Sequence, residues 1–160
     1  MTDEPVAIIG AGRMGRGVSL ALRAAGVSAL VLGRERSSDD VRAAALVLIA
    51  VPDDAIGAVA AELSRDRAIE PRHIVLHLSG LLDRHALHAL ADTGAGLGSF
   101  HPLQSIADPD TATIRLRGAY AALEGDPRAL EAGARLARAL GMRGVRLAPG
   151  AKAAYHAGAV

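Results

Sequence analysis

The sequence predicts an α/β domain with a doubly wound, mostly parallel sheet and helices on both faces, which is a three-layer α/β/α fold. Short apolar runs without polar alternation, such as 6–9 and 46–51, are typical of parallel strands that are buried on both faces. These runs alternate along the chain with segments of helical periodicity, as expected of a doubly wound sheet. The length of 160 residues fits one domain.

The first half of the chain alternates between strands and helices. We expect strands at 6–9, 28–32, 46–51 and 73–78, and helices at 16–25, 41–44, 54–63 and 81–91. Gly26 is a stop signal for the first of these helices. A polar loop is expected at 33–40, and Asp53 or Asp54 is expected to cap the helix that begins at 54.

The second half continues the pattern and then changes. We expect strands at 97–100, 119–124 and 144–147, and a helix at 127–140 with Pro127 in its first turn. A new helix begins at 149, and the sequence stops inside it. We therefore expect a dinucleotide-binding domain over residues 1–148, and over 149–160 the start of a helix that leads into a missing helical domain.

Composition and charge exclude several classes of function. The formal net charge is +1 and the charges are scattered, which argues against a nucleic-acid partner. The absence of cysteine excludes disulfides, thiolate catalysis and cysteine zinc sites, and no other metal site is expected. No apolar stretch reaches the roughly 20 residues of a membrane span. The first apolar run follows acids rather than a basic segment, so we expect no signal peptide and a cytoplasmic location.

A glycine-rich turn directly follows the first strand and opens the first helix. In the run Gly10-Ala11-Gly12-Arg13-Met14-Gly15, the first glycine permits a tight turn and the second permits approach of a pyrophosphate. The third, Gly15, lets the helix pack closely on the strand, and the helix N-terminus offers free N–H groups to phosphates. This context predicts a dinucleotide site that includes Arg13 and Met14, although a glycine turn without a ligand would have the same sequence.

The end of the second strand favours NADP over NAD. An NAD site usually has an acid there, whereas an NADP site uses arginine. Arg34 can stack on the adenine and pair with the 2′-phosphate, and Ser37 can add a donor. Glu35 leaves the NAD alternative open, because a shift of one or two residues would make it the ribose-binding acid. These residues can also be read as solvated loop charges.

Ala50, Val51 and Pro52 end another buried strand. They lie at the carboxyl edge of the predicted sheet, where ligands of open α/β sheets bind. We expect their backbone to line the path from the ribose to the nicotinamide. A simple strand-to-helix turn is the alternative reading, and the two are compatible.

Polar residues in three motifs are candidates for the chemical site. Ser79 and His101 follow or end predicted strands, so they are expected at the same edge as the cofactor. The Ser79 hydroxyl and the His101 imidazole can donate to a substrate oxygen. The third motif is the segment 152–156 at the end of the chain. A single histidine is more often a packed or surface residue than a functional one, so that alternative stays open for His101.

The pieces GAGRMG, LIAVPDDAI, HLSG, GSFHPLQSI and YHAGAV occur in this order. Their combination resembles a family of Rossmann-like NAD(P)-dependent oxidoreductases with an N-terminal dinucleotide-binding domain and a C-terminal all-helical domain. That family is related to ketopantoate reductase, pyrroline-5-carboxylate reductase, prephenate dehydrogenase and the 6-phosphogluconate dehydrogenase group. The chain matches the N-terminal domain only. The resemblance implies that the last helix continues into a domain that closes over the nicotinamide and forms a homodimer.

The resemblance also implies roles for single residues. Several relatives place a lysine on this last helix with a polar residue one turn later, and Lys152 and His156 have that spacing. Lys152 is then the proton donor, supported by His156, while His101 and Ser79 orient the substrate. The FHPLQS piece is similar to a substrate-contacting segment of prephenate dehydrogenases, which favours His101 over His77.

The function expected from these features is an NADP-dependent reductase or dehydrogenase of a small carbonyl or hydroxy acid. The chain alone is expected to be inactive, because half of the pocket is missing. Two alternatives remain from the sequence. One is a nucleotide-binding module without catalysis, and the other is an NAD-dependent hydroxyacid dehydrogenase that uses Glu35.

Overall fold

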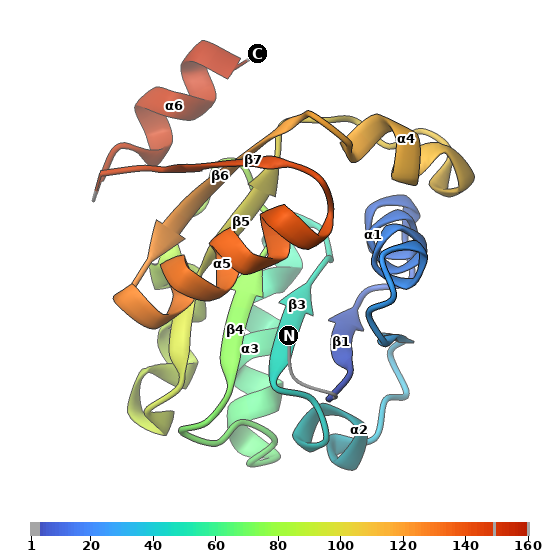
Figure 1. The fold of residues 1–160 in the computed structure, drawn as a ribbon. Helices are drawn as coiled ribbons and strands as arrows, with labels where there is room; N and C mark the ends of the chain where they lie inside the picture. The colour runs from blue at the N-terminus through green and yellow to red at the C-terminus, as the bar shows by residue number, and fades with distance from the viewer. Residues whose placement is uncertain (1–3, 149, 160) are drawn as a thin grey trace.

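The computed structural model of the protein describes residues 4–148 and 150–159, without the side chains of residues 153, 156 and 159. Its centre is a seven-stranded sheet in the order β2-β1-β3-β4-β5-β6-β7 (Figure 1). The strands are β1 (Val6–Ile9), β2 (Ala29–Leu32), β3 (Leu46–Ile49), β4 (Ile74–His77), β5 (Gly96–Pro102), β6 (Tyr120–Gly125) and β7 (Arg143–Arg146). Neighbouring strands run parallel except β5 and β6, which pair antiparallel.

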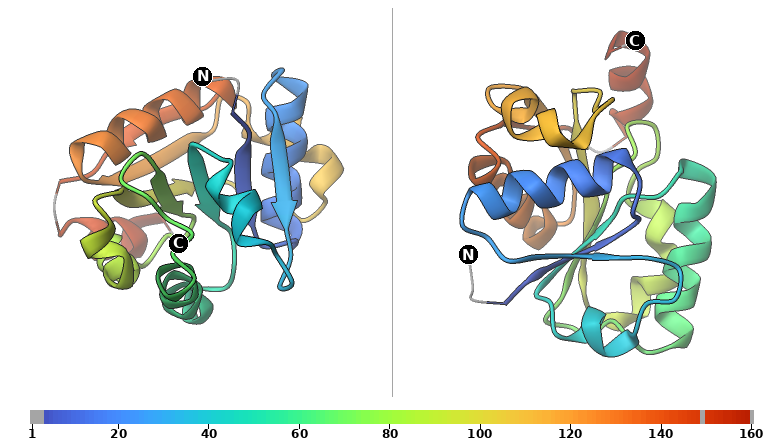
Figure 2. Two further views of the ribbon diagram at one scale, coloured as in Figure 1. Left: turned by 90° about the horizontal axis from the view of Figure 1, so that it is seen from below. Right: turned by 90° about the vertical axis from the view of Figure 1, so that its right-hand side faces the viewer.

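Helices cover both faces of the sheet, which confirms the predicted three-layer fold (Figure 2). The α-helices are α1 (Arg13–Ala24), α2 (Ser38–Arg42), α3 (Asp53–Arg65), α4 (Ala112–Leu116), α5 (Pro127–Ala139) and α6 (Lys152–Ala159), and the 3-10 helices are η1 (Arg84–Thr93) and η2 (Pro109–Thr111). One face packs against α1, α4 and α5, and the other against α2, α3 and η1. The last helix, α6, lies outside both layers (Figure 1).

The inner strands β1 and β3 are apolar throughout because each contributes to two cores. In β1, Ile8 belongs to the core under α1 and α5, whereas Ile9 belongs to the core under α3 and η1. Successive side chains of a strand point to opposite faces, so a strand between two helical layers has no solvent-facing position. Phe100, the single phenylalanine, is fully buried in the α1 side of the core.

Several local predictions are wrong, and each has a local cause. The helix expected at 81–91 is the 3-10 helix η1, whose start is capped by the Asp83 carboxylate. The loop expected at 33–40 contains the start of α2, which Ser37 caps by accepting from the N–H of Asp39. The segment between β5 and β6, left without structure by the sequence, contains η2 and α4, and Asp108 caps η2.

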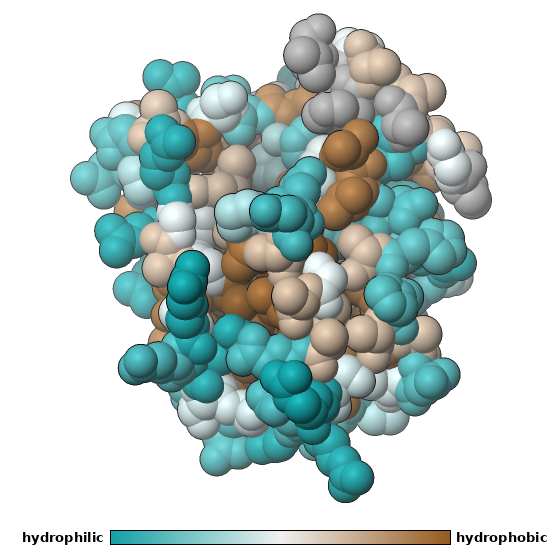
Figure 3. Space-filling view, turned by 180° about the vertical axis from the view of Figure 1, so that it is seen from behind, coloured by the Kyte–Doolittle hydropathy of each residue, from teal (hydrophilic) through white to brown (hydrophobic). Residues whose placement is uncertain are grey.

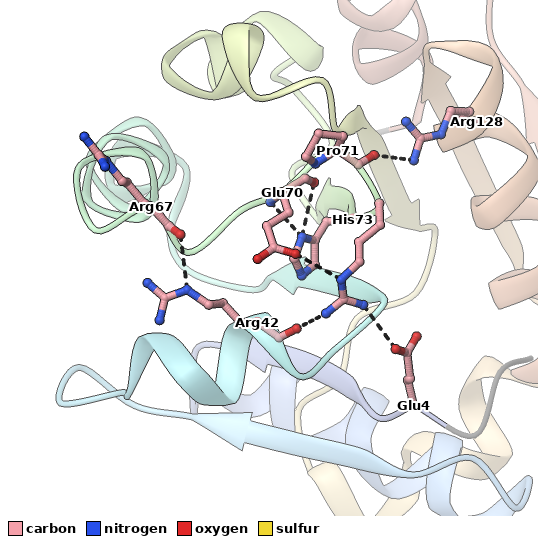
Figure 4. Close-up of polar contacts among 8 residues, drawn as sticks. Glu4, Arg42, Arg67, Glu70, Pro71, His73 and Arg128 are labelled. Atoms are coloured by element: carbon pink, nitrogen blue, oxygen red, sulfur yellow. Dashed lines mark hydrogen bonds and ion pairs between the residues drawn. The ribbon is translucent and has the colours of Figure 1, made fainter.

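Arginines fasten the amino edge of the sheet to the surrounding loops (Figure 4). Arg128 donates to the carbonyl oxygens of Pro71 and Gly94 at 2.7 and 3.0 Å. Arg72 pairs with Glu4 and also donates to the carbonyl oxygen of Arg42. These bonds satisfy backbone carbonyls that loops would otherwise leave to solvent, so this edge is held by charge-assisted bonds to the main chain.

Within residues 4–148 and 150–159, no helix has both the length and the apolar character needed to cross a bilayer.

Candidate cofactor and substrate site

The turn between β1 and α1 has the geometry that a pyrophosphate needs. Gly10 has a φ of +123°, and a Cβ there would collide with the carbonyl oxygen of Ala50. A Cβ on Gly15 would collide with the carbonyl oxygen of Gly10, so this glycine lets α1 pack against the turn. Gly12, the N-cap of α1, has nothing within 4 Å of its Cβ position and makes no side-chain cap. The free amides of α1 therefore face open space, which fits an anionic group.

The strand order places this turn at the point where the sheet reverses its winding. From β1 the chain goes to β2 on one side, and the next strand, β3, lies on the other side of β1. In open α/β sheets ligands bind outside the carboxyl ends of the strands at such a switch point. The fold thus directs a ligand to the glycine turn and to the residues that follow β3.

A groove of three adjoining hollows runs along this edge, and all three are lined by Ala50 and Val51. The hollow beside the second strand has a volume of about 680 Å³, the middle one about 580 Å³, and the one beside Ser79 and His101 about 660 Å³. On the rear face, where α3 lies, apolar side chains gather near the middle within polar surroundings (Figure 3). The α3 residues Ala55, Ala58 and Val59 line the first hollow.

Two arginines and one acid line the hollow beside β2. Arg34 and Arg36 contribute to its wall, and the Glu62 carboxylate pairs with the Arg36 guanidinium at 2.8 Å. The Arg36 side chain is only 7% exposed, so this pair is a fixed part of the wall. Glu35 is exposed and does not belong to the lining, and Ser37 is used as the cap of α2.

Ser79 lies at the other end of the groove with its hydroxyl fully bonded. It donates to the Asp53 carboxylate at 2.8 Å and accepts from the N–H groups of Leu81 and Leu82. Asp53 therefore does not cap α3 as predicted, since the N-cap is Pro52 and makes no side-chain bond. Together Ser79 and Asp53 fix the loop after β4 against the start of α3 at the groove wall.

The His101 ring lines the same end of the groove and is fixed by two neighbours. A Cβ on Gly80 would lie 2.6 Å from Cε1 of this ring, so only glycine permits the ring to pack here. The Tyr155 ring of α6 meets it edge to face at 6.0 Å between centroids, and the Tyr155 hydroxyl lies 3.4 Å from Nδ1. Burial raises the pKa of the Tyr155 phenol above its ordinary value.

His77 ends β4 as a buried, neutral imidazole. Its Nδ1 accepts from the N–H of Ser79 at 3.3 Å, so the proton lies on Nε2, 2.9 Å from the carbonyl oxygen of Asp83. Burial lowers the pKa of His77 to about 4 from its ordinary 6.5, and the nearby Lys152 charge acts in the same direction. His77 therefore supports the loop that carries Ser79 and does not line the groove.

Lys152 lies behind the groove. Its side chain is 2% exposed, and its amine donates to the Ser99 hydroxyl at 2.6 Å. Burial lowers the pKa of Lys152 to about 8 from 10.5, although the carboxylates of Glu124, Asp83 and Asp53 oppose the shift by attraction. A buried amine whose pKa lies near neutral can both hold and release a proton.

The structure brings most of the predicted site residues to one edge. Those lining the groove are Gly10, Gly12, Arg13, Met14, Arg34, Ala50, Val51, Pro52, Ser79 and His101. Gly15 supports the turn from beneath, Ser37 faces α2, and Lys152 is buried beside the groove. The predicted support of Lys152 by His156 falls on a side chain that lies outside the described ones.

No role of their own was predicted for Ser99, Glu124 and Tyr155, and Asp53 was expected only as a helix cap. One signal in the sequence pointed to this region. Lys152 is the only lysine among the 18 lysine and arginine residues, which marks its surroundings as unusual. In the described part of the chain, no three His, Asp or Glu side chains are grouped to hold a metal ion.

Another hollow, of about 770 Å³, lies at the opposite edge of the sheet between α5 and the starts of β1, β3 and β4. Its arginines already have partners. Arg72 pairs with Glu4 and Glu70, Arg135 pairs with Glu131, and Arg128 binds backbone carbonyls. We place the functional site at the carboxyl edge, because there the glycine turn and the titratable groups converge.

Comparison with known proteins agrees with this fold. A family model described as a Rossmann-like domain matches residues 33–102. No functionally curated protein matches the sequence.

Several solved structures share the fold at low sequence identity. Arogenate dehydrogenase from Synechocystis superposes with a TM-score of 0.73 at 17% identity, covering 92% of this chain and 61% of the other. Prephenate dehydrogenase from Aquifex aeolicus in complex with hydroxyphenyl propionate and NAD+ gives 0.73 at 15% identity, with 95% and 62% covered. An imine reductase from Bacillus cereus gives 0.70 at 19% identity, with 96% and 58% covered.

The chain therefore has the Rossmann-like fold of these dehydrogenases and reductases, as its resemblance predicts. It spans less than two thirds of the length of each of them.

Proposed function

We propose that this chain is the cofactor-binding part of an NADP-dependent oxidoreductase that acts on a small carbonyl or hydroxy acid. The observation that supports this most is the continuous groove at the carboxyl edge. It joins the uncapped start of α1 to Arg34 at one end and to Ser79 and His101 at the other. A dinucleotide needs an anion site for its pyrophosphate and different side chains around its adenosine and nicotinamide ends, and this groove offers both.

The proposed cofactor contacts follow the groove. The amides at Gly12 hold the pyrophosphate, and the backbone of Ala50 and Val51 lines the path toward Ser79. When bound, the cofactor supplies the hydride, so that a carbonyl gains a hydride and a proton and becomes an alcohol. The chain's own residues position the cofactor, exclude water and provide the proton.

The preference for NADP rests on the charges in the hollow beside β2. Arg34 lines it, and Glu35, the acid required by the NAD alternative, is outside the lining. Glu62 is the acid in the wall, but its carboxylate is already paired with Arg36. A 2′-phosphate thus meets an arginine there, and a ribose hydroxyl meets no unpaired carboxylate among the described lining residues.

The proposed source of the proton is Lys152. In the reduction, its ammonium releases the proton that the substrate oxygen gains, and the neutral amine remains. His101 lines the groove and orients the substrate, while Ser79 acts through the Asp53 carboxylate that it holds. Support of the lysine by His156, a homodimeric state and a cytoplasmic location are further parts of this proposal.

Titration with NADPH and NADH tests the proposal directly. We expect Arg34→Ala to weaken NADPH binding about tenfold or more, because a charge-assisted bond contributes about 1.5–3 kcal/mol. NADH binding should weaken less, because NADH lacks the 2′-phosphate and can lose only the stacking of Arg34 on the adenine. Arg65→Ala is the matched control, since the Arg65 side chain is 73% exposed on α3 and lies outside the groove.

Two results would contradict the proposal. Equal affinity of the wild-type chain for NADPH and NADH, unaffected by Arg34→Ala, would reject NADP preference. If neither nucleotide bound to the folded chain, the function itself would be rejected.

A further inference from the structure

A row of buried polar side chains crosses the sheet at the level where β4 ends. His77 in β4 is in register with Ser99 in β5, and Ser99 is directly opposite Glu124 in β6. Residues in register project from the same face of a sheet. The three are 0%, 2% and 8% exposed, in the same order. Polar residues are rarely this buried without a partner, so the row needs an explanation.

Lys152 of α6 provides that explanation. Its amine reaches the middle of the row, where it donates to Ser99 Oγ at 2.6 Å. Glu124 is held in place by the backbone N–H of Arg84, which donates to Oε2 at 2.8 Å. The Glu124 carboxylate is also the group that most strongly favours the charged form of Lys152.

We propose that Ser99 and Glu124 are positioning residues that form a cradle for the Lys152 amine, fixing its place by a hydrogen bond and its charge by attraction. This inference rests on the proposed function only in assigning a proton-donating role to Lys152. Whatever the function of Lys152, the cradle sets where its amine lies and how tightly the amine holds its proton.

The electrostatic surroundings of the amine make such a cradle necessary. Burial of an ammonium costs free energy and lowers its pKa unless acceptors and negative charges compensate. Ser99 supplies the acceptor. Negative charges come from Glu124 on β6, from Asp83 before η1 and from Asp53 on α3, while His77 on β4 is neutral at physiological pH.

The choice of lysine also supports the cradle. Every other member of the 18 lysine and arginine residues is arginine, and a guanidinium stays charged at all accessible pH values. An amine in a cradle of this kind can release its proton near neutral pH. The position therefore holds the single lysine of the chain, whose amine can serve as a proton donor.

The single lysine makes the test direct. Lysine labelled with carbon-13 at Cε and incorporated into the chain gives one side-chain NMR signal, whose pH titration reports the pKa of Lys152. We expect a midpoint near 8 in the wild-type chain. Ser99→Ala and Glu124→Gln should each increase the acid dissociation constant of Lys152 about tenfold or more, because each removes a group that favours the ammonium.

Matched variants separate a cradle from a general loss of structure. Glu131→Gln removes one negative charge from an exposed position on α5 and should leave the midpoint unchanged. Ser99→Thr retains the hydroxyl and should restore the midpoint toward the wild-type value. If Glu124→Gln fails to fold, the contrast between Ser99→Ala and Ser99→Thr still decides the question.

A wild-type midpoint near the value of free lysine would overturn the cradle. Unchanged Lys152 midpoints in folded Ser99→Ala and Glu124→Gln would overturn it as well. NADPH titration of the same samples keeps the two proposals apart. Loss of NADPH binding with the midpoint shifts intact would reject the function alone, and NADPH binding without the shifts would reject the cradle alone.

Discussion

The two edges of the sheet bury polar groups for different purposes, and the histidines at the two ends of β4 show the difference. His73 precedes β4 at the amino edge and His77 ends it at the carboxyl edge, and both are completely buried. Nδ1 of His73 accepts from the N–H of Glu70, and the neighbouring arginines bind backbone carbonyls (Figure 4). His77 instead lies beside Lys152, another group that titrates.

The amino edge is marked by arginines bonded to the main chain, and the carboxyl edge by two groups whose pKa values are shifted. Arginine remains charged and binds the main chain, so it contributes to the folded state at any pH. The carboxyl edge holds an imidazole with a pKa of about 4 and an amine with a pKa of about 8, and both values result from burial. The arginine bonds at the amino edge stabilise the fold, whereas burial at the carboxyl edge shifts the pKa values of groups that can transfer protons.

The largest expected effect is the acid sensitivity caused by His77. The folded pKa of about 4 lies below the unfolded 6.5, so the unfolded chain binds a proton first as the pH falls. Stability is therefore lost between pH 6.5 and 4, and the loss from His77 alone should reach about 3 kcal/mol. Urea unfolding at a series of pH values measures it, and His77→Gln should flatten the profile.

His85 is the matched control for this prediction. Its side chain is 79% exposed on η1, so His85→Gln should leave the slope between pH 6.5 and 4 in place. If His77 titrated near 6.5 by NMR in the folded chain, burial would not have lowered its pKa, and the proposed distinction between the two edges would be wrong.

An intermediate effect is expected at the amino edge. Arg128→Met removes the bonds to the carbonyl oxygens of Pro71 and Gly94 and should lower the free energy of unfolding by about 1–2 kcal/mol. Arg138→Met, at an exposed position of the same helix, should change it by less than about 0.5 kcal/mol. A loss of NADPH binding or a shifted Lys152 titration in Arg128→Met would show that the two edges are coupled.

The smallest effect concerns the pair Glu131–Arg135 on α5. The two side chains are 71% and 44% exposed, and their charges are 2.7 Å apart at a spacing of four residues. Arg135→Gln should lower the free energy of unfolding by only about 0.3–0.5 kcal/mol, because solvent screens exposed pairs. The change in the free energy of unfolding should be smaller still in high salt. A decrease above about 1 kcal/mol would mean that the residues around this pair stabilise the fold more than the structure indicates.

Features that depend on local sequence could be predicted. The roles of Gly10 and Gly15 follow from where a turn joins a strand to a helix, and the structure gives them close approaches that fit those roles. Ser79 and His101 could be placed at one edge because parallel strands end on the same side. The layers could also be predicted, since apolar runs without alternation require cover on both faces.

Features that depend on pairing between distant segments could not be predicted from the sequence. The register that sets Ser99 opposite Glu124 comes from an antiparallel pair in a sheet expected to be mostly parallel. The burial of Lys152 depends on where α6 docks. Asp53 had a plausible local role as a helix cap, but its carboxylate instead binds the Ser79 hydroxyl, 26 positions away in the sequence.

The outer strand β7 has a consequence for how copies of this chain can meet. All four of its residues are exposed, and Arg143 and Arg146 stand at its two ends, with the Arg143 guanidinium over the Tyr120 ring. Joining two sheets through this margin would bring the arginines of both copies together, and their repulsion would oppose a continuous intermolecular sheet. The positive charge on β7 thus opposes edge-to-edge association of further copies of the sheet. The proposed homodimer must use another surface.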